Sequence, residues 1–165
     1  MKIAVISDTH MPKRAKALPL TLIENLKSVD LIIHAGDWQT LDVYHQLCEF
    51  APVEGVYGNV DDEPVRNQFE KNLVIEVGNV TIGITHGGGK NKTTEKRALD
   101  QMEYENVDIL IYGHSHIPVV KEIDDMLLFN PGSATDKRRQ SHFSFGLINV
   151  GDTVLCRHVF YDSKE

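Results

Sequence analysis

The stretch Lys2-Ile-Ala-Val-Ile-Ser-Asp-Thr-His10 is a short apolar run that ends abruptly in polar residues. The same pattern returns in Asp30-Leu-Ile-Ile-His-Ala-Gly-Asp37, Val80-Thr-Ile-Gly-Ile-Thr-His-Gly87 and Val107-Asp-Ile-Leu-Ile-Tyr-Gly-His-Ser-His116. Continuous runs of Val, Ile and Leu of this length are typical of strands buried on both faces. The four stretches therefore predict four buried strands, each followed by a polar loop.

Helices are predicted between these strands. Apolar residues fall at helical spacing over residues 18–28, with Pro19 tolerated in the first turn, and this segment makes a β-α-β unit with the flanking strands. A second helix is predicted over 41–50, before a strand over 53–57, and a third over 94–105.

The C-terminal third changes character. Strands are predicted over 118–123, 126–129, 143–150 and 153–161, joined by turns at Asp124-Asp125 and Gly151-Asp152. This pattern favours an antiparallel half. The chain as a whole is expected to be an α/β protein with two packed sheets at the centre and helices outside.

Length and composition are those of one ordinary domain. The chain has 165 residues, 41% hydrophobic and 25% charged, so a single domain over 1–165 is expected. No apolar run approaches the roughly 18 to 20 residues of a membrane span or the length of a signal peptide, so a cytoplasmic location without membrane contact is expected. Two cysteines without a short-range motif give a disulfide framework little support.

The charge balance is acidic, with a net charge of -7 and a pI of about 5.6. Nucleic-acid binders more often carry a basic footprint, so small substrates are favoured over long nucleic acids. Bound divalent cations would still make the local field positive, so a metal-dependent nuclease stays as an alternative.

Ligand-type side chains sit at the carboxyl ends of the predicted strands. Loops at that edge of an open α/β sheet converge on one crevice, so side chains from five separate segments are expected to meet there. Residues two apart would also point to the same side, as in Asp8-x-His10 and His114-x-His116. The full set is Asp8, His10, Asp37, Asn59, His86, His114 and His116.

This set of imidazoles, carboxylates and one amide predicts a metal centre. Mixed nitrogen and oxygen ligands without thiolate argue against a structural zinc or a calcium site. Seven ligands exceed the need of one tetrahedral ion, and two ions sharing a carboxylate, about 3.5 to 4 Å apart, are the economical solution. We expect two divalent ions, Mn²⁺ first, with Ni²⁺, Zn²⁺, Fe, Co²⁺ or Mg²⁺ as alternatives.

The ordered set of motifs resembles a known family. Asp8-Thr-His10, Gly36-Asp37, Gly58-Asn59, His86-Gly87 and Gly113-His-Ser-His116 are similar to the five motifs of the calcineurin-like metallophosphoesterase superfamily. The small size and the late Asn130-Pro-Gly-Ser133 resemble its compact bacterial and archaeal phosphodiesterase branch.

The resemblance implies a four-layer αββα sandwich of two mixed sheets flanked by helices, and a phosphoesterase, with a small phosphodiester as the expected substrate. It implies that Asp8, His10, Asp37 and His116 hold one metal. Asp37, Asn59, His86 and His114 would hold the other, with Asp37 as the bridge. A hydroxide between the ions would attack phosphorus directly. Whether the chain forms a homo-oligomer is left open.

One position departs from the family pattern. Many members have a histidine directly after Gly-Asn that can protonate the leaving group, whereas this chain has Val60. Asp61 is the substitute we consider, besides Asp37, Asn59 and His86 as catalytic residues, although a carboxylate beside two cations tends to stay ionised. A preference for good leaving groups, such as aryl phosphates, is therefore expected.

Other interpretations of the sequence are kept as alternatives to a phosphoesterase. A protein-interaction scaffold could keep the fold without catalysis, although all seven ligand positions are intact. His34, inside an apolar run, is expected in the core or behind a ligand. Lys137-Arg138-Arg139 could bind a substrate phosphate, but a solvated basic loop is the simpler interpretation.

Overall fold

The first sheet is built around β1, which lies at its centre. The computed structural model of the protein describes residues 1–103 and 105–165. The strands of this sheet run in the order β10-β9-β1-β2-β3. They are β1 (Lys2–Ile6), β2 (Leu31–His34), β3 (Val53–Gly55), β9 (Phe143–Val150) and β10 (Val154–Tyr161). β1, β2 and β3 are parallel, while β9 is antiparallel to both of its neighbours.

The second sheet runs in the order β4-β5-β6-β8-β7. It consists of β4 (Asn72–Val77), β5 (Val80–Thr85), β6 (Ile109–Ile111), β7 (Val119–Ile123) and β8 (Met126–Asn130). β5, β6 and β8 are parallel, and the edge strands β4 and β7 are antiparallel to their neighbours. Both sheets are therefore mixed.

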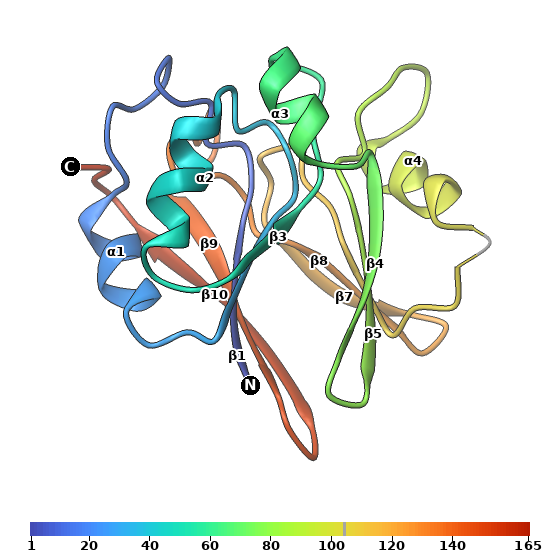
Figure 1. The fold of residues 1–165 in the computed structure, drawn as a ribbon. Helices are drawn as coiled ribbons and strands as arrows, with labels where there is room; N and C mark the ends of the chain where they lie inside the picture. The colour runs from blue at the N-terminus through green and yellow to red at the C-terminus, as the bar shows by residue number, and fades with distance from the viewer. Residues whose placement is uncertain (104) are drawn as a thin grey trace.

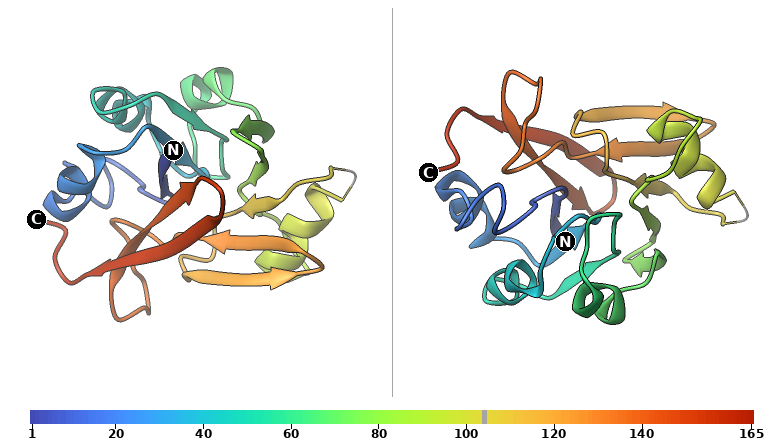
Figure 2. Two further views of the ribbon diagram at one scale, coloured as in Figure 1. Left: turned by 90° about the horizontal axis from the view of Figure 1, so that it is seen from below. Right: turned by 90° about the horizontal axis from the view of Figure 1, so that it is seen from above.

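The described residues form four helices. They are α1 (Leu20–Leu26), α2 (Leu41–Cys48), α3 (Glu63–Gln68) and α4 (Thr94–Gln101). Of these, α1, α2 and α4 cover the outer faces of the two sheets, and α3 lies at the top edge in Figure 1. α1 and α2 lie on one side of the molecule and α4 on the other, with both sheets between them (Figure 1). The views along the strands show the same order of layers (Figure 2). The predicted four-layer αββα sandwich is confirmed.

The alternation of side chains between the two faces of β1 explains why this strand is apolar from Ile3 to Ile6. Ile3 and Val5 belong to the hydrophobic cluster between the sheets, whereas Ala4 and Ile6 pack with the α1 and α2 residues Leu22 and Leu47. Successive side chains of a strand point to opposite faces, so a strand between two apolar layers is apolar at every position. A third cluster joins α4 to the second sheet.

Several predicted elements differ from the observed ones. The helices predicted over 18–28, 41–50 and 94–105 are shorter, and residue 104 of the last lies outside the described residues. The C-terminal strands form no separate antiparallel half, because β7 and β8 extend the second sheet while β9 and β10 extend the first. The antiparallel pairing of β7 with β8 and of β9 with β10 is as predicted, but the parallel pairing of β8 with β6 was not predicted, since hairpins carry no signal for the sheet they join.

The sequence analysis did not predict α3 or β4. Asp62 caps α3, since its side chain accepts a hydrogen bond from the amide of Val65, and Pro64 lies in the first turn. β4 forms a hairpin with β5 across the Gly78-Asn79 turn. Both signals are present in the sequence, as a helix cap followed by proline and as a Gly-Asn turn between apolar residues.

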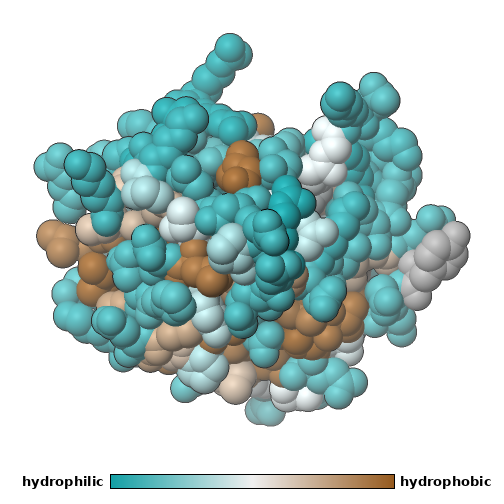
Figure 3. Space-filling view, turned by 45° about the horizontal axis from the view of Figure 1, so that its top comes forward, coloured by the Kyte–Doolittle hydropathy of each residue, from teal (hydrophilic) through white to brown (hydrophobic). Residues whose placement is uncertain are grey.

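The parallel strands define one edge of the molecule, here called the site edge. It consists of the carboxyl ends of β1, β2, β3, β5 and β6 and lies at the top of Figure 1. The turns of the β4-β5 and β9-β10 hairpins lie at the opposite end (Figure 1). The face turned forward in Figure 3 is mainly hydrophilic, with apolar side chains in scattered groups.

Among the described residues, no helix has both the length and the apolar character that crossing a membrane requires.

Candidate metal centre

The structure brings all seven predicted ligand residues together at the site edge. Each follows the end of a strand, and their side chains form two adjoining groups. The Asp8 cluster consists of Asp8, His10 and His116, and the Asp37 cluster consists of Asp37, Asn59, His86 and His114.

The backbone of these loops is strained in a regular way. Five of the seven residues have a left-handed backbone, although none is a glycine. Their φ angles are 56° for Asp8, 44° for His10, 60° for Asp37, 70° for His114 and 62° for His116. Such conformations cost of order 1–3 kcal/mol each and persist only where the surrounding structure fixes them, commonly at functional sites. The strain supports a functional role for this edge.

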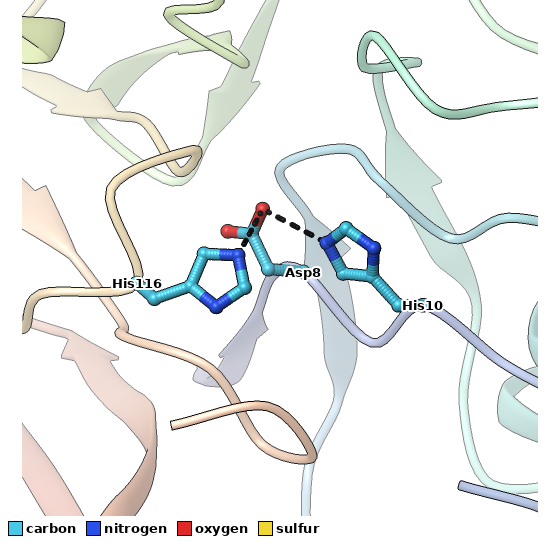
Figure 4. A group of neighbouring side chains, drawn as sticks. All are labelled: Asp8, His10 and His116. Atoms are coloured by element: carbon cyan, nitrogen blue, oxygen red, sulfur yellow. Dashed lines mark ion pairs between the residues drawn. The ribbon is translucent and has the colours of Figure 1, made fainter. Parts of the chain in front are cut away.

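The three side chains of the Asp8 cluster face one another in a buried space (Figure 4). Asp8 Oδ1 lies 3.7 Å from His10 Nε2 and 3.4 Å from His116 Nε2. All three atoms are buried and have no hydrogen-bond partner among the described residues. Buried polar atoms without partners are costly, and a shared cation would satisfy all three. The residues present therefore fit a bound metal ion.

The remaining atoms of Asp8 and His116 are held by the protein. Asp8 Oδ2 accepts hydrogen bonds from Ser7 Oγ at 2.7 Å and from the His114 amide at 3.0 Å. His116 Nδ1 contacts the carbonyl of Asp136, so this nitrogen carries the proton and donates it. Nε2 of His116 then faces the cluster and, in the neutral ring, offers the lone pair that metal binding requires.

The Asp37 cluster repeats this arrangement. His86 Nδ1 donates to the carbonyl of Ala35 at 2.8 Å, and Asp37 Oδ1 accepts from the Val60 amide at 3.1 Å. His86 Nε2 then lies 3.2 Å from Asp37 Oδ2, 3.0 Å from Asn59 Oδ1 and 3.3 Å from His114 Nδ1. Atoms that are mostly acceptors thus converge, and a proton or a metal ion must lie among them.

Asp37 lies between the two clusters. Its Oδ2 is 3.2 Å from His86 Nε2 and 3.4 Å from His10 Nε2, which belongs to the Asp8 cluster. The same oxygen therefore faces both groups of side chains. This position fits the bridging carboxylate that the family resemblance implies.

The charges of the two clusters depend on one another. Burial would lower the pKa of His86, but the hydrogen bond to Asp37 and the charges of Asp8 and Asp37 raise it to about 9. Burial would raise the pKa of Asp8, but the His10 and His116 imidazoles hold it well below its usual range. The site thus favours anionic carboxylates with a cation beside them.

Asp61 lies behind the metal centre. It is 6% exposed, and its carboxylate accepts hydrogen bonds from the amides of Asp37, Gly58 and Gln39 at 3.0, 2.7 and 2.6 Å. Burial raises its pKa above the usual value. These contacts tie the loop of Asn59 to that of Asp37. The role of Asp61 as a proton donor stays a prediction.

The sequence analysis placed His34 in the core or behind a ligand, and the structure shows that it supports two ligand loops from the core. Nδ1 accepts a hydrogen bond from the Gly36 amide at 3.1 Å, so Nε2 donates to Thr9 Oγ1 at 3.1 Å. The ring stacks on Trp38 at 3.8 Å. Burial lowers the pKa of His34 to about 3, which keeps it neutral. Its expected place in the core is confirmed.

Glycine is required at two positions of close approach. A Cβ atom at Gly58 would lie 2.1 Å from Asp37 Oδ1, and one at Gly113 would lie 2.0 Å from Ser7 Oγ. These distances are far below van der Waals contact. A side chain at either position would therefore displace Asp37 or Ser7, and only glycine lets the loops approach this closely.

Two basic segments, the predicted phosphate-binding candidate over 137–139 and a second one over 13–16 just after His10, have different surroundings. Arg14 pairs with Asp136 at 3.4 Å. Lys137 lies over the ring of Phe143 at 5.1 Å, while Arg138 and Arg139 are exposed. Among the described residues, no side chain of these segments forms a hydrogen bond or an ion pair with the two clusters, although the Arg14 amide donates to the carbonyl of His10 at 2.7 Å.

Sequence relatives cover most of the chain. Residues 1–153 match the profile of the calcineurin-like phosphoesterase superfamily domain. A probable metallophosphoesterase of Methanothermobacter thermautotrophicus is 37% identical over 142 residues, covering 84% of this chain and 80% of that protein. A phosphodiesterase of Methanocaldococcus jannaschii is 33% identical over 146 residues, covering 80% of this chain and 83% of that protein.

Solved structures share the architecture. That of Vps29 from Entamoeba histolytica in complex with zinc gives a TM-score of 0.77 at 27% identity, covering 97% of this chain and 99% of that one. That of an archaeal phosphodiesterase gives a TM-score of 0.74 at 26% identity, covering 98% and 100%. The likeness therefore extends over nearly the full chain.

Proposed function

Because the chain belongs to the calcineurin-like phosphoesterase superfamily, we propose that it is a metal-dependent phosphodiesterase with a dinuclear centre. The observation that carries the proposal is the pair of adjoining clusters, in which buried atoms of Asp8, His10 and His116 lack partners and Asp37 faces both groups. A relative named as a phosphodiesterase supports diesters as the substrate class.

The residues of this chain would hold the ions and orient the substrate. Asp8, His10 and His116 would bind one ion, Asn59, His86 and His114 the other, and Asp37 both. Two divalent ions bound there supply a water of lowered pKa and neutralise charge on the phosphoryl oxygens. Mn²⁺ is the ion we propose first, because nitrogen and oxygen donors suit it.

The leaving group would receive little help from the protein. Val60 is 41% exposed in the loop where many relatives have histidine, and it offers no proton. Asp61 is the remaining candidate acid, but its carboxylate is engaged by three backbone amides. We therefore propose a preference for diesters with good leaving groups, so that nitrophenyl diesters react much faster than alkyl diesters.

The test is hydrolysis of bis-p-nitrophenyl phosphate and p-nitrophenyl phosphate by metal-stripped protein after Mn²⁺, Ni²⁺, Zn²⁺ or Mg²⁺ is restored. We expect metal-dependent turnover, faster on the diester, that His86→Ala abolishes. His45→Ala is the matched control, because His45 is exposed on α2 and should keep full activity.

Inactivity with every metal, despite stoichiometric binding, would contradict the proposal and favour the scaffold alternative. Salt-sensitive cleavage of DNA or RNA, with little turnover of small diesters, would instead favour the nuclease alternative.

A further inference from the structure

A cavity opens directly beside the Asp37 cluster. Its volume is about 260 Å³, and Asn59 and His86 form part of its wall. The other lining residues include Tyr57, Arg66, Lys71 and Gln101. A site for a whole small molecule usually measures about 300–1,000 Å³, so this cavity has room for part of a substrate. A phosphoryl group held at the clusters would place one of its substituents here.

The wall of the cavity is cationic in an acidic protein. The chain carries a net charge of -7, yet among the described residues no Asp or Glu lines this cavity, and Arg66 and Lys71 do. Because no carboxylate in the wall opposes these two charges, the cavity favours an anionic group over a neutral one.

Arg66 and Lys71 differ in what they already bind. Arg66 donates to the carbonyls of Asp61, Gly58 and Asn59 at 2.9, 3.3 and 3.2 Å, and its guanidinium lies 4.9 Å from the ring centre of Tyr57. Lys71 is exposed and makes no side-chain hydrogen bond or ion pair among the described residues. Arg66 is thus committed to the loop of Asn59, and Lys71 is free to bind a ligand.

From this arrangement we propose that the cavity is a subsite for a second anionic group of the substrate, with Lys71 as its specificity-determining residue. The inference rests on the proposed function and narrows it. The substrates would be phosphodiesters that carry a phosphate monoester or a similar anion close to the scissile phosphate. The ammonium of Lys71 would pair with that anion, and Arg66 would contribute its charge.

A second basic cavity is the rival site. Its volume is about 410 Å³, and Lys137, Arg138 and Arg139 line it together with Ser115, Ile117 and Gln140. None of its lining residues belongs to either metal cluster, whereas the first cavity includes two that do. Direct contact with the metal-binding residues therefore favours the first cavity.

The experiment compares two probes that differ by one phosphate. Thymidine 3′,5′-bisphosphate and thymidine 5′-monophosphate are tested as competitive inhibitors of bis-p-nitrophenyl phosphate hydrolysis by the Mn²⁺-loaded protein. We expect the bisphosphate to bind about tenfold more tightly or better, since the added phosphate gains charge-assisted hydrogen bonds. Lys71→Gln should remove most of this advantage, and Lys71→Arg should keep it.

Two variants control for the loss of one positive charge. Lys27→Gln changes an exposed residue far from the site, paired with Glu24, and should leave the ratio of the two inhibition constants unchanged. Arg139→Gln tests the rival cavity. Equal affinity for both probes in the wild-type protein, or a ratio that responds to Arg139→Gln and not to Lys71→Gln, would overturn the inference.

Failure of the proposed function can be distinguished from failure of the subsite. If no metal supports turnover, calorimetric titration of the Mn²⁺-loaded protein with the two probes still measures the ratio of their dissociation constants. A ratio that depends on Lys71 in an inactive protein would support the subsite and contradict the enzyme, whereas turnover without such a ratio would do the reverse.

Discussion

The Asp8 cluster and the Asp37 cluster are built in the same way but differ in their exposure to solvent. In each, a backbone amide from another loop holds one carboxylate oxygen, and a histidine donates Nδ1–H to a backbone carbonyl. Asp8 is fully buried and His116 is 1% exposed, whereas Asn59 is exposed and His114 is half-buried. One ion site is therefore enclosed, and the other opens to the substrate side.

This difference predicts an order of binding. In the Asp8 cluster, three buried atoms lack partners, so the metal-free state is costly there. In the Asp37 cluster, His86 and Asp37 satisfy each other through a proton while the metal is absent. We expect the first ion to bind at the Asp8 cluster and to stabilise the fold, and the second to bind more weakly and complete the active enzyme.

The largest expected effect separates two histidines of the same loop. His116→Ala should remove the enclosed ion and, with it, the metal-induced rise in Tm. His114→Ala should remove the open ion alone and leave most of that rise. Both should lower kcat by more than about a hundredfold, because loss of a group behind a ligand already costs about 10- to 100-fold. Metal content and thermal unfolding distinguish the two variants, and equal loss of both ions in both variants would break the comparison.

The next effect concerns the support of one carboxylate oxygen. Ser7→Ala removes one of the two donors to Asp8 Oδ2 and leaves the His114 amide. The affinity for the enclosed ion should fall by about 10- to 100-fold, while that for the open ion changes little. Ser28→Ala, on the exposed surface, is the control for calorimetric titration. An equal fall at both sites would show that the clusters are coupled more strongly than their geometry indicates.

The sequence predicted the metal centre better than it predicted what holds it together. Strand runs that end in Asp, His or Gly-Asn mark candidate ligands locally, so all seven candidates could be named from the sequence, and the structure brings them together. Their supports join distant segments, such as Ser133 Oγ to the carbonyl of Asp8 across 125 positions of sequence. No local pattern indicates such a contact.

The fold, like the metal centre, was predictable where the signal is local and not where it depends on contacts between distant segments. Buried strands such as β1 and β2 carry a strong periodic signal because both of their faces are covered. α3 is short and largely exposed, so the hydrophobic pattern over it is weak, whereas β4 contains the apolar run Leu73-Val-Ile75, which the sequence analysis did not use. Sheet order depends on pairing between distant strands, which hydrophobic periodicity does not encode.

A moderate effect is expected for Asp61→Asn on the open site. The amide group would place a donor against backbone N–H groups, so the free energy of unfolding should fall by about 1–3 kcal/mol and the open ion should bind more weakly. If Asp61 acts only through the loop of Asn59, alkyl and nitrophenyl diesters will slow by the same factor. A greater loss for the alkyl diester would identify Asp61 as the acid, and an unchanged rate would exclude both roles.

The smallest effect is a pH dependence of the metal-free protein. The pKa of His86 is about 9 in the folded chain against 6.5 in the unfolded chain. Its contribution to stability is therefore complete below pH 6.5 and is lost as the pH rises to 9, so Tm should fall by several degrees in that window. His86→Gln should flatten this part of the profile. In the metal-loaded protein the ion replaces the proton, so the rise in Tm on adding metal should grow with pH. A rise in Tm that is the same at every pH would contradict this account.

The most direct test of two unlike metal sites is a calorimetric titration of metal-free protein with Mn²⁺, with bis-p-nitrophenyl phosphate hydrolysis measured at each step. We predict two ions per chain, the first raising Tm without turnover and the second bringing activity. Binding of a single ion, or full activity after the first, would contradict the account.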